Sequence, residues 1–156
     1  ITDFPYEEIL KQIRKDTAIN ADFIEELLNT QKDSKYSFSI LSLIYPYLDY
    51  KNNNFHKDHL HPESKFSDLS DSDKTKYSWG QYNSICNLQM LDANKNMSKN
   101  GKSLNEWVEK EVKTKDRTTF LENHLIPDVD LELNNFDNFY TSRKKILTIK
   151  LTDLLS

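Results

Sequence analysis

A short segment near the middle of the chain combines residue types that could carry out a hydrolysis. Asp58-His59-Leu60-His61-Pro62 places a carboxylate, two imidazoles and a turn-forming proline within five positions. A neutral imidazole can accept a proton near neutral pH. Asn87 lies 28 residues after His59, and Asn96 and Lys99 follow it at spacings of nine and three residues. Carboxylate and amide oxygens, as in Asp58 and Asn96, are hard ligands that favour Mg²⁺ or Mn²⁺ over zinc.

These side chains need a backbone that brings them together. Neighbouring residues on a β-strand point to opposite faces, so Asp58 and His59 cannot aim at one point from a flat strand. We therefore expect a bulge or a twist at the strand end, with Pro62 ending the strand pairing soon afterwards.

The pattern resembles the His-Asn-His (HNH) nuclease motif, whose ββα-metal fold consists of two short antiparallel strands and a helix that clasp one divalent ion. The match is closest to the HNH domains that read Asp-His-Ile-x-Pro, then Asn-x-x-Leu, then Asn and Lys. This chain offers Asp58 to Pro62, then Asn87 to Leu91, then Lys95-Asn96 and Lys99.

The resemblance implies a metal-dependent endonuclease that hydrolyses DNA phosphodiester bonds. In the family, His59 matches the general base, and Asp58 and Asn96 match the ligands of Mg²⁺ (or Mn²⁺). Asn87 matches the asparagine that ties the loop and orients the histidine. Lys99 would then face the scissile phosphate or an adjacent one.

His61 is a departure from the commonest pattern. Some family members with Asp-His-x-His place the second histidine against the phosphate, whereas others carry a hydrophobic residue there, so we count His61 with His59 and Asn87 as a catalytic candidate. Lys95 and Lys102 lie with Lys99 in an acid-free stretch, and we expect all three on the DNA-facing side.

Several alternatives stay open. A second basic stretch, Arg143 to Lys150, could join the first in a cationic face, or both stretches could be solvated helix surfaces. The motif could also belong to a nucleic-acid-binding module that does not cut. A zinc-stabilised structural domain is a third alternative, since His56, His59, His61 and Cys86 are all zinc-type ligands. His56 and His124 lie outside the pattern, and we expect each of them to face solvent or to pack against other side chains.

The rest of the chain predicts a mainly α, α+β fold, in which a helical domain wraps a small ββα-metal motif. Apolar residues recur at helical spacing in several segments, and β-strand patterning is confined to residues 87–91. We expect the helices in residues 4–15, 20–29, 37–48, 76–85, 103–112, 118–125 and 135–155, and a polar loop over residues 64–73.

Composition excludes some function classes. The chain has 156 residues, a net charge of −4 and only two glycines. Two glycines are too few for a phosphate-binding Walker loop or a glycine-rich dinucleotide-binding motif. No apolar run is long enough to span a bilayer. A single cysteine permits no internal disulfide, which fits a reducing, cytoplasmic location.

The end of the chain, from Phe120 through Arg143 into an amphipathic helix, is similar to the segment that follows the nuclease motif in GmrSD-type, modification-dependent restriction proteins. That resemblance implies a bacterial restriction or phage-defence protein with a ParB-like nucleotide-hydrolysing domain N-terminal to a helical linker. We accordingly expect residues 1–36 to be the end of a helical linker and residues 37–156 to form the nuclease domain. The start at Ile1, without Met, suggests a piece of a longer protein. A homodimer is left open as the form that cuts both strands.

Overall fold

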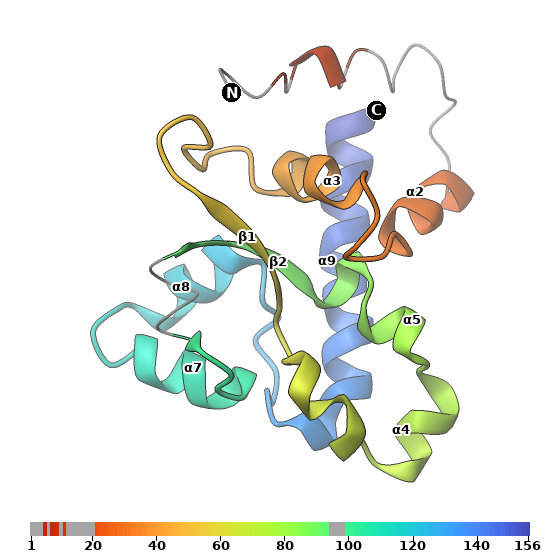
Figure 1. Cartoon of the computed structure of the whole chain (residues 1–156), viewed down its shortest axis with the longest axis vertical. Coiled ribbons are helices and arrows are strands. Elements are labelled where there is room, and N and C mark those ends of the chain that lie inside the picture. The colour runs from red at the N-terminus through yellow and green to blue at the C-terminus, as the bar shows by residue number, and fades with distance from the viewer. Residues whose placement is uncertain (1–4, 6, 10, 12–20, 94–98) are drawn as a thin grey trace.

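A computed structural model describes residues 5, 7–9, 11, 21–93 and 99–156. The chain is mostly helical with a two-stranded antiparallel sheet, which confirms the predicted α+β class (Figure 1). The helices and strands are α2 (Ala21–Leu28), α3 (Ser37–Ile44), β1 (Phe55–His59), α4 (Asp71–Lys76), α5 (Trp79–Tyr82), β2 (Leu88–Asp92), α7 (Leu104–Glu111), α8 (Arg117–His124) and α9 (Phe136–Leu155). Short 3-10 helices span Glu63–Asp68, Ile85–Asn87 and Leu133–Asn135.

The long helix α9 is the element around which the others pack, and it confirms the helix predicted over residues 135–155. Its buried residues recur every three or four positions and so form one continuous face. Helices α2 and α3 and the Ile85–Asn87 turn pack against α9, which Figure 1 shows in blue along most of the molecule. Because α2 belongs to the predicted linker, that segment is in direct contact with the predicted nuclease domain.

Helix α3 forms the hydrophobic centre that its sequence predicts. Six of its eight residues are buried, because helices and the sheet surround it. The helix ends at Ile44, two residues before Pro46. A proline disfavours helical geometry in the residue before it, and Tyr45 accordingly leaves the helical region at φ −115° and ψ 63°.

Strands β1 and β2 form a regular hairpin-like pair, although 28 residues separate them. Their register pairs Phe55 with Asp92 and continues without interruption to His59 with Leu88. The Leu60 amide then donates to the Asn87 carbonyl at 2.8 Å, which extends the pairing by one step. The expected bulge is therefore absent from this strand pair, and side-chain alternation is preserved up to His59.

Helices α7 and α8 lie on one side of the hairpin, and α3 lies on the other (Figure 1). Ser103 caps α7, accepting a hydrogen bond from the Glu106 amide while the Glu106 carboxylate accepts one from the Ser103 amide. Asp116 caps α8 through the Thr119 amide. Both helices confirm the elements predicted at these positions.

Two predicted elements were wrong. Residues 76–85 do not form one helix: Tyr77 is extended, and only the single turn of α5 follows it. Residues 64–73 are not a polar loop but carry a 3-10 helix and the start of α4. The helix predicted over residues 4–15 lies mostly outside the described residues.

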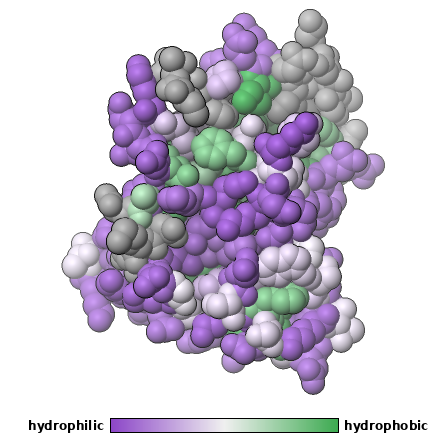
Figure 2. All heavy atoms as spheres, viewed as in Figure 1, coloured by the Kyte–Doolittle hydropathy of each residue, from purple (hydrophilic) through white to green (hydrophobic). Residues whose placement is uncertain are grey.

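Figure 2 shows that polar side chains cover most of the face seen in Figure 1, with small separate apolar areas between them. Within the described part of the chain, no helix combines the length and the apolar character that crossing a membrane requires.

Candidate functional site

Asp58 and His59 end strand β1 and point to opposite faces of the hairpin. Residues opposite each other in an antiparallel pair share a face, so Asp58 lies beside Gln89 and His59 lies beside Leu88. The two candidate residues therefore meet different surroundings, one on each side of the strand.

Two buried side chains, those of Gln89 and Lys99, contact the Asp58 carboxylate. Its Oδ2 accepts from Gln89 Nε2 at 3.0 Å and lies 3.3 Å from Lys99 Nζ. Lys99 also donates to the His59 carbonyl at 2.8 Å, and its Nζ lies 5.8 Å from the centre of the Trp107 ring. Burial lowers the pKa of Lys99, while the Asp58 charge opposes that shift.

The position of Lys99 does not fit the prediction that it lies on the DNA-facing side, and it does not fit the alternative of a solvated helix surface either. The residue is only 2% exposed, and its ammonium is turned inward to Asp58 and to the backbone of His59. Its chain segment has returned to the hairpin after β2, so the contact joins residues 40 positions apart. Lys99 thus holds the end of β1 rather than offering a free surface charge.

His59 is buried and is held by a side chain that the sequence analysis missed. Its Nε2 lies 2.8 Å from Asn83 Oδ1. The Asn83 Nδ2 donates to Gln31 Oε1 and Asp33 Oδ1, so its Oδ1 is the acceptor and His59 Nε2 carries the proton. In the neutral ring, Nδ1 is then the proton acceptor. Burial lowers the pKa of His59, and the Asn83 hydrogen bond offsets part of that shift.

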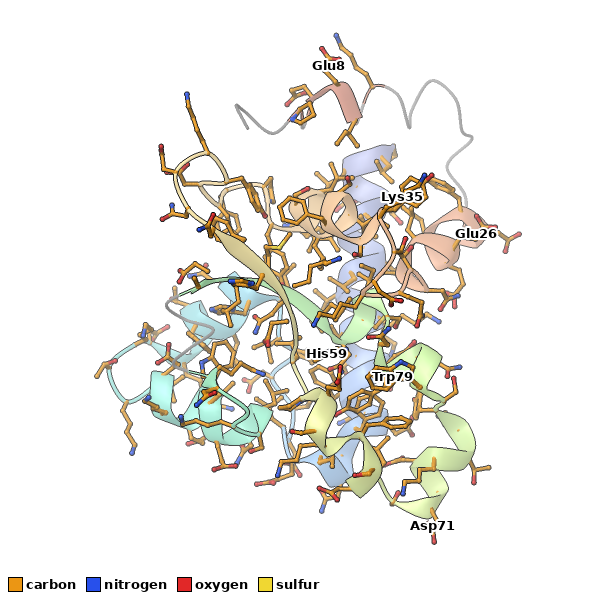
Figure 3. All side chains as sticks on the ribbon, in the orientation of Figure 1. Glu8, Glu26, Lys35, His59, Asp71 and Trp79 are labelled. Atoms are coloured by element: carbon orange, nitrogen blue, oxygen red, sulfur yellow. The ribbon has the colours of Figure 1, made fainter. Side chains whose placement is uncertain are left out.

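A surface hollow of about 420 Å³ opens beside Asn83 and Trp79, the side chains that contact the His59 ring. Asn83 and Trp79, whose ring centre lies 5.7 Å from that of His59, form part of its wall (Figure 3). The remaining lining residues are Lys32, Asp33, Lys57 and Glu63. The hollow therefore combines both signs of charge with an aromatic side chain, and the residues Asn83 and Trp79 separate it from the buried His59.

Asn87 ties the loop ends together but does not contact the His59 side chain. The residue is fully buried, and its Oδ1 accepts from the His61 amide at 2.9 Å. Its Nδ2 donates to the carbonyls of His61 and Tyr82, both at 3.0 Å. Asn87 thus joins the segment after β1 to the segment before β2, while Asn83 is the asparagine that orients the histidine.

The structure does not place His61 where it could meet a phosphate. Its side chain is 1% exposed, and its ring packs edge-on against Phe139 and Phe136 at 4.6 and 5.5 Å. Among the described residues its Nε2 has no hydrogen-bond partner. Burial lowers the pKa of His61 to about 3, so the ring is neutral near pH 7. This corrects its assignment as a catalytic candidate.

Two of the predicted ligands and contacts lie outside the described residues, namely Asn96 and Lys95. Lys102 is described and half-buried. Among the described residues no group of three His, Cys, Asp or Glu side chains could hold a metal, so the alternative zinc site is not formed there. Cys86 is buried, and burial raises the pKa of its thiol to about 11. Asp58 is then the described oxygen ligand that matches the motif, and Asn96 would have to complete the set.

Arg143 cannot contribute to a cationic face formed by the second basic stretch, because its side chain is buried. Arg143 Nη1 donates to the carbonyls of Ile85, Cys86 and Leu88 at 2.7 to 3.2 Å. Its Nε and Nη2 donate to the Leu125 carbonyl and to Tyr45 Oη. The neighbouring Lys144 forms an exposed ion pair with Glu25 at 2.6 Å. The Arg143 side chain is therefore a clamp on the strand that carries Gln89.

His124, which sequence reasoning left as a solvent-facing or packing residue, is connected to Asp58. Its ring packs on Phe120 with centres 4.5 Å apart, and its Nδ1 lies 2.9 Å from Gln89 Oε1. Since Gln89 Nε2 donates to Asp58, one buried glutamine links the imidazole to the carboxylate. A glutamine among the apolar residues of β2 was the sequence signal for this link.

No protein-family model matches the chain, and no curated protein is significantly similar to it. The site must therefore be judged on its own geometry. The end of β1, with Asp58 and His59, lies beside the start of β2, and the chain after β2 returns so that Lys99 contacts both residues.

Proposed function

We propose that the chain is a metal-dependent endonuclease that hydrolyses DNA phosphodiester bonds at the end of strand β1. The observation that carries the proposal is the return of the chain after β2, which brings Lys99 onto Asp58 and the His59 carbonyl. Strand β1, strand β2 and the segment that carries Lys99 follow one another along the chain in the order of the elements of a ββα-metal motif. The surrounding helices fit the class of helical nuclease domains that the sequence resembles.

His59 is the general base in this proposal. Hydrolysis requires that water lose a proton as it attacks phosphorus. Burial favours the neutral imidazole, and the Nε2 hydrogen bond to Asn83 leaves Nδ1 to accept that proton. The hollow is lined by Asn83 and Trp79, the two side chains that contact the buried His59 ring, so the proposal requires water to reach the ring past them.

Asp58, with Asn96, would hold Mg²⁺ or Mn²⁺ through oxygen atoms. Because Asp58 and His59 lie on opposite faces of β1, the proposal requires the reacting phosphate to lie at the end of the strand, within reach of both side chains. The metal would supply positive charge that stabilises the departing oxygen. Because Lys99 lies against the same carboxylate, a cation must compete with its ammonium, and metal affinity should depend on both. Lys95 and Lys102 stay candidates for contacts to the DNA backbone.

Replacing His59 with alanine should lower the rate of plasmid cleavage by at least about 100-fold, the lower range for loss of a positioned acid or base. The assay compares nicked and linear plasmid over time with Mg²⁺, Mn²⁺ or chelator. His56→Ala is the matched control, since His56 lies on the same strand but is exposed. Asp58→Asn should also weaken the dependence of the rate on metal concentration.

Equal cleavage by the His59→Ala variant and the parent chain would contradict this mechanism. Binding of DNA by the parent without any cleavage, with either metal, would instead favour a binding module that keeps the motif's shape. The buried Lys99–Asp58 contact favours that second candidate, because it neutralises the carboxylate without a metal.

Asn83→Ala should slow cleavage by about 10-fold or more, because the imidazole loses the hydrogen bond that orients it. The hydrogen bond to Asn83 raises the pKa of His59, so its loss should lower that pKa further. The acidic limb of the pH–rate profile should then move to lower pH in the variant. A slower variant with an unmoved limb would show that Asn83 acts only through stability, which the unfolding midpoint measures independently.

A further inference from the structure

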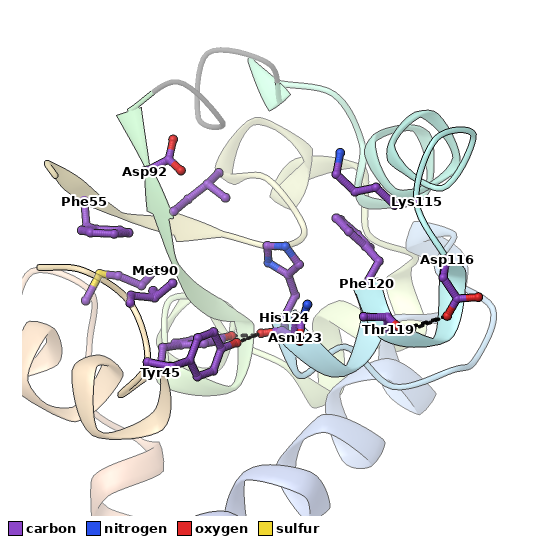
Figure 4. Close-up of a pocket in the computed structure, with 13 residues that line it drawn as sticks. Tyr45, Phe55, Met90, Asp92, Lys115, Asp116, Thr119, Phe120, Asn123 and His124 are labelled. Atoms are coloured by element: carbon purple, nitrogen blue, oxygen red, sulfur yellow. Dashed lines mark hydrogen bonds between the residues drawn. The ribbon is translucent and has the colours of Figure 1, made fainter.

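A second cavity, of about 320 Å³, opens between β2 and α8 (Figure 4). It shares no lining residue with the hollow beside Asn83 and Trp79. Buried apolar and aromatic side chains, among them Met90 and Phe120, form its floor. Its mouth carries exposed polar groups, including Tyr47 and Asn123. An apolar floor with a few polar groups at the rim is typical of a site for a small molecule or for one unit of a polymer.

We propose that this cavity binds one nucleobase of the nucleic-acid substrate. The inference rests on the proposed nuclease function and adds to it a second contact with the substrate, away from the reacting phosphate. Three features of the cavity support it: the aromatic walls, the sign of charge at the mouth and the connection to Asp58.

The walls of the cavity suit a flat ring. Tyr47 is 60% exposed at the mouth, and its hydroxyl donates to the Asn123 carbonyl, which fixes the ring at the rim. Deeper in the cavity, Phe120 and His124 lie with their ring centres 4.5 Å apart. Aromatic faces bind nucleobases by stacking, and they do so with every base because each has a π-face.

The charges at the mouth favour a base over a phosphate. Two acidic residues, Asp92 and Asp116, and one basic residue, Lys115, are among its lining residues. The Lys115 ammonium is paired with Glu111 at 3.3 Å. The Asp116 carboxylate accepts hydrogen bonds from the Thr119 amide and hydroxyl, which hold its pKa below the ordinary value and keep it charged. Such groups repel a phosphodiester but accept hydrogen bonds from the amino groups of adenine, cytosine or guanine.

The wall of the cavity is connected to Asp58 by hydrogen bonds. His124 lines the cavity, and Gln89 joins it to Asp58 through hydrogen bonds of 2.9 and 3.0 Å. One side chain and two hydrogen bonds thus separate the cavity wall from the proposed metal ligand. The link runs through the fully buried Gln89 and so couples the cavity wall to Asp58 through the interior of the domain.

Titration of the isotope-labelled chain with cytidine or adenosine, in chelator, tests the proposal by NMR. Shift changes should concentrate on the lining residues. Tyr47→Ala should weaken binding by between about 5-fold and 150-fold, the range for loss of one base–aromatic stack. Tyr36→Ala is the matched control, because Tyr36 is also 60% exposed but does not line the cavity, and it should leave the affinity unchanged.

Thr119→Trp provides a second variant, since Thr119 is exposed on α8 and its side chain lines the cavity. The larger ring should fill the cavity and abolish nucleoside binding. The unfolding midpoint is measured alongside, because the substitution also removes the hydrogen bond from the Thr119 hydroxyl to Asp116. No binding by the parent at millimolar nucleoside, or binding that neither Tyr47→Ala nor Thr119→Trp weakens, overturns the proposal. Plasmid cleavage is measured separately: cleavage without nucleoside binding rejects only the base site. Nucleoside binding without cleavage rejects only the nuclease function.

Discussion

Replacing Arg143 with alanine should lower the free energy of unfolding by about 3 to 5 kcal/mol, because leaving each buried acceptor unsatisfied costs about 1 to 3 kcal/mol. The side chain is completely buried and donates to four backbone carbonyls and the Tyr45 hydroxyl. Alanine would leave these acceptors without their donor in a place that water reaches poorly. The substitution also removes a large buried side chain and leaves a cavity.

The expected loss is large because Arg143 joins elements that are far apart in the sequence. Its carbonyl partners Ile85, Cys86 and Leu88 lead into β2, and Leu125 follows α8 in the left-handed conformation, at φ 56°. These carbonyls are not all used by regular secondary structure. The guanidinium satisfies them from α9 and so fixes the strand that presents Gln89 to Asp58.

Urea denaturation of the parent, Arg143→Ala and Arg143→Lys measures the effect. Lysine keeps the charge but lacks the planar, five-donor fork, so it should also lose most of the stability. Lys144→Ala is the matched control, since the ion pair of Lys144 with Glu25 is partly exposed and should contribute less than about 1 kcal/mol. If Arg143→Ala lowers the free energy of unfolding no more than Lys144→Ala does, Arg143 does not hold these elements together.

Local sequence signals predicted the elements that depend on local physics. The Ser103 cap, with Glu106 three residues on, marks the start of α7, and the spacing of apolar residues marks α9. The helix predicted over residues 76–85 does not form because of a tertiary contact. Tyr77 is extended because its ring packs between Phe136 and Tyr140 of α9, with centres 5.1 and 4.9 Å away. No local pattern contains that contact.

The candidate site was predictable only in part, for the same reason. The motif located Asp58 and His59 at a strand end and Asn87 at the start of the partner strand. The inward turn of Lys99 and the hydrogen bond from His59 to Asn83 depend on contacts between residues 24 or more positions apart. A charged residue in an acid-free stretch indicates a surface by default, and only the fold shows that this lysine is buried.

His61→Leu should remove much of the acid sensitivity of the fold. Burial lowers the pKa of His61 to about 3, whereas in the unfolded chain it would titrate near 6.5. Between these values the unfolded state binds the extra proton, so stability falls as pH decreases from about 6.5 towards 3. At pH 5 the loss from this one group is about 2 kcal/mol, at 1.36 kcal/mol for each pH unit.

Leucine fits the position, because the surroundings are the rings of Phe136 and Phe139 and because Asn87 contacts only the backbone of residue 61. Urea unfolding at pH 7 and pH 5 should show a smaller pH-dependent loss in the variant than in the parent. Some loss should persist, since burial lowers the pKa of His59 as well. His56→Leu, at an exposed position on β1, controls for removal of an imidazole. An unchanged difference between the two pH values in His61→Leu would mean that the ring gains a proton with little penalty, and therefore that it can reach solvent or a ligand after all.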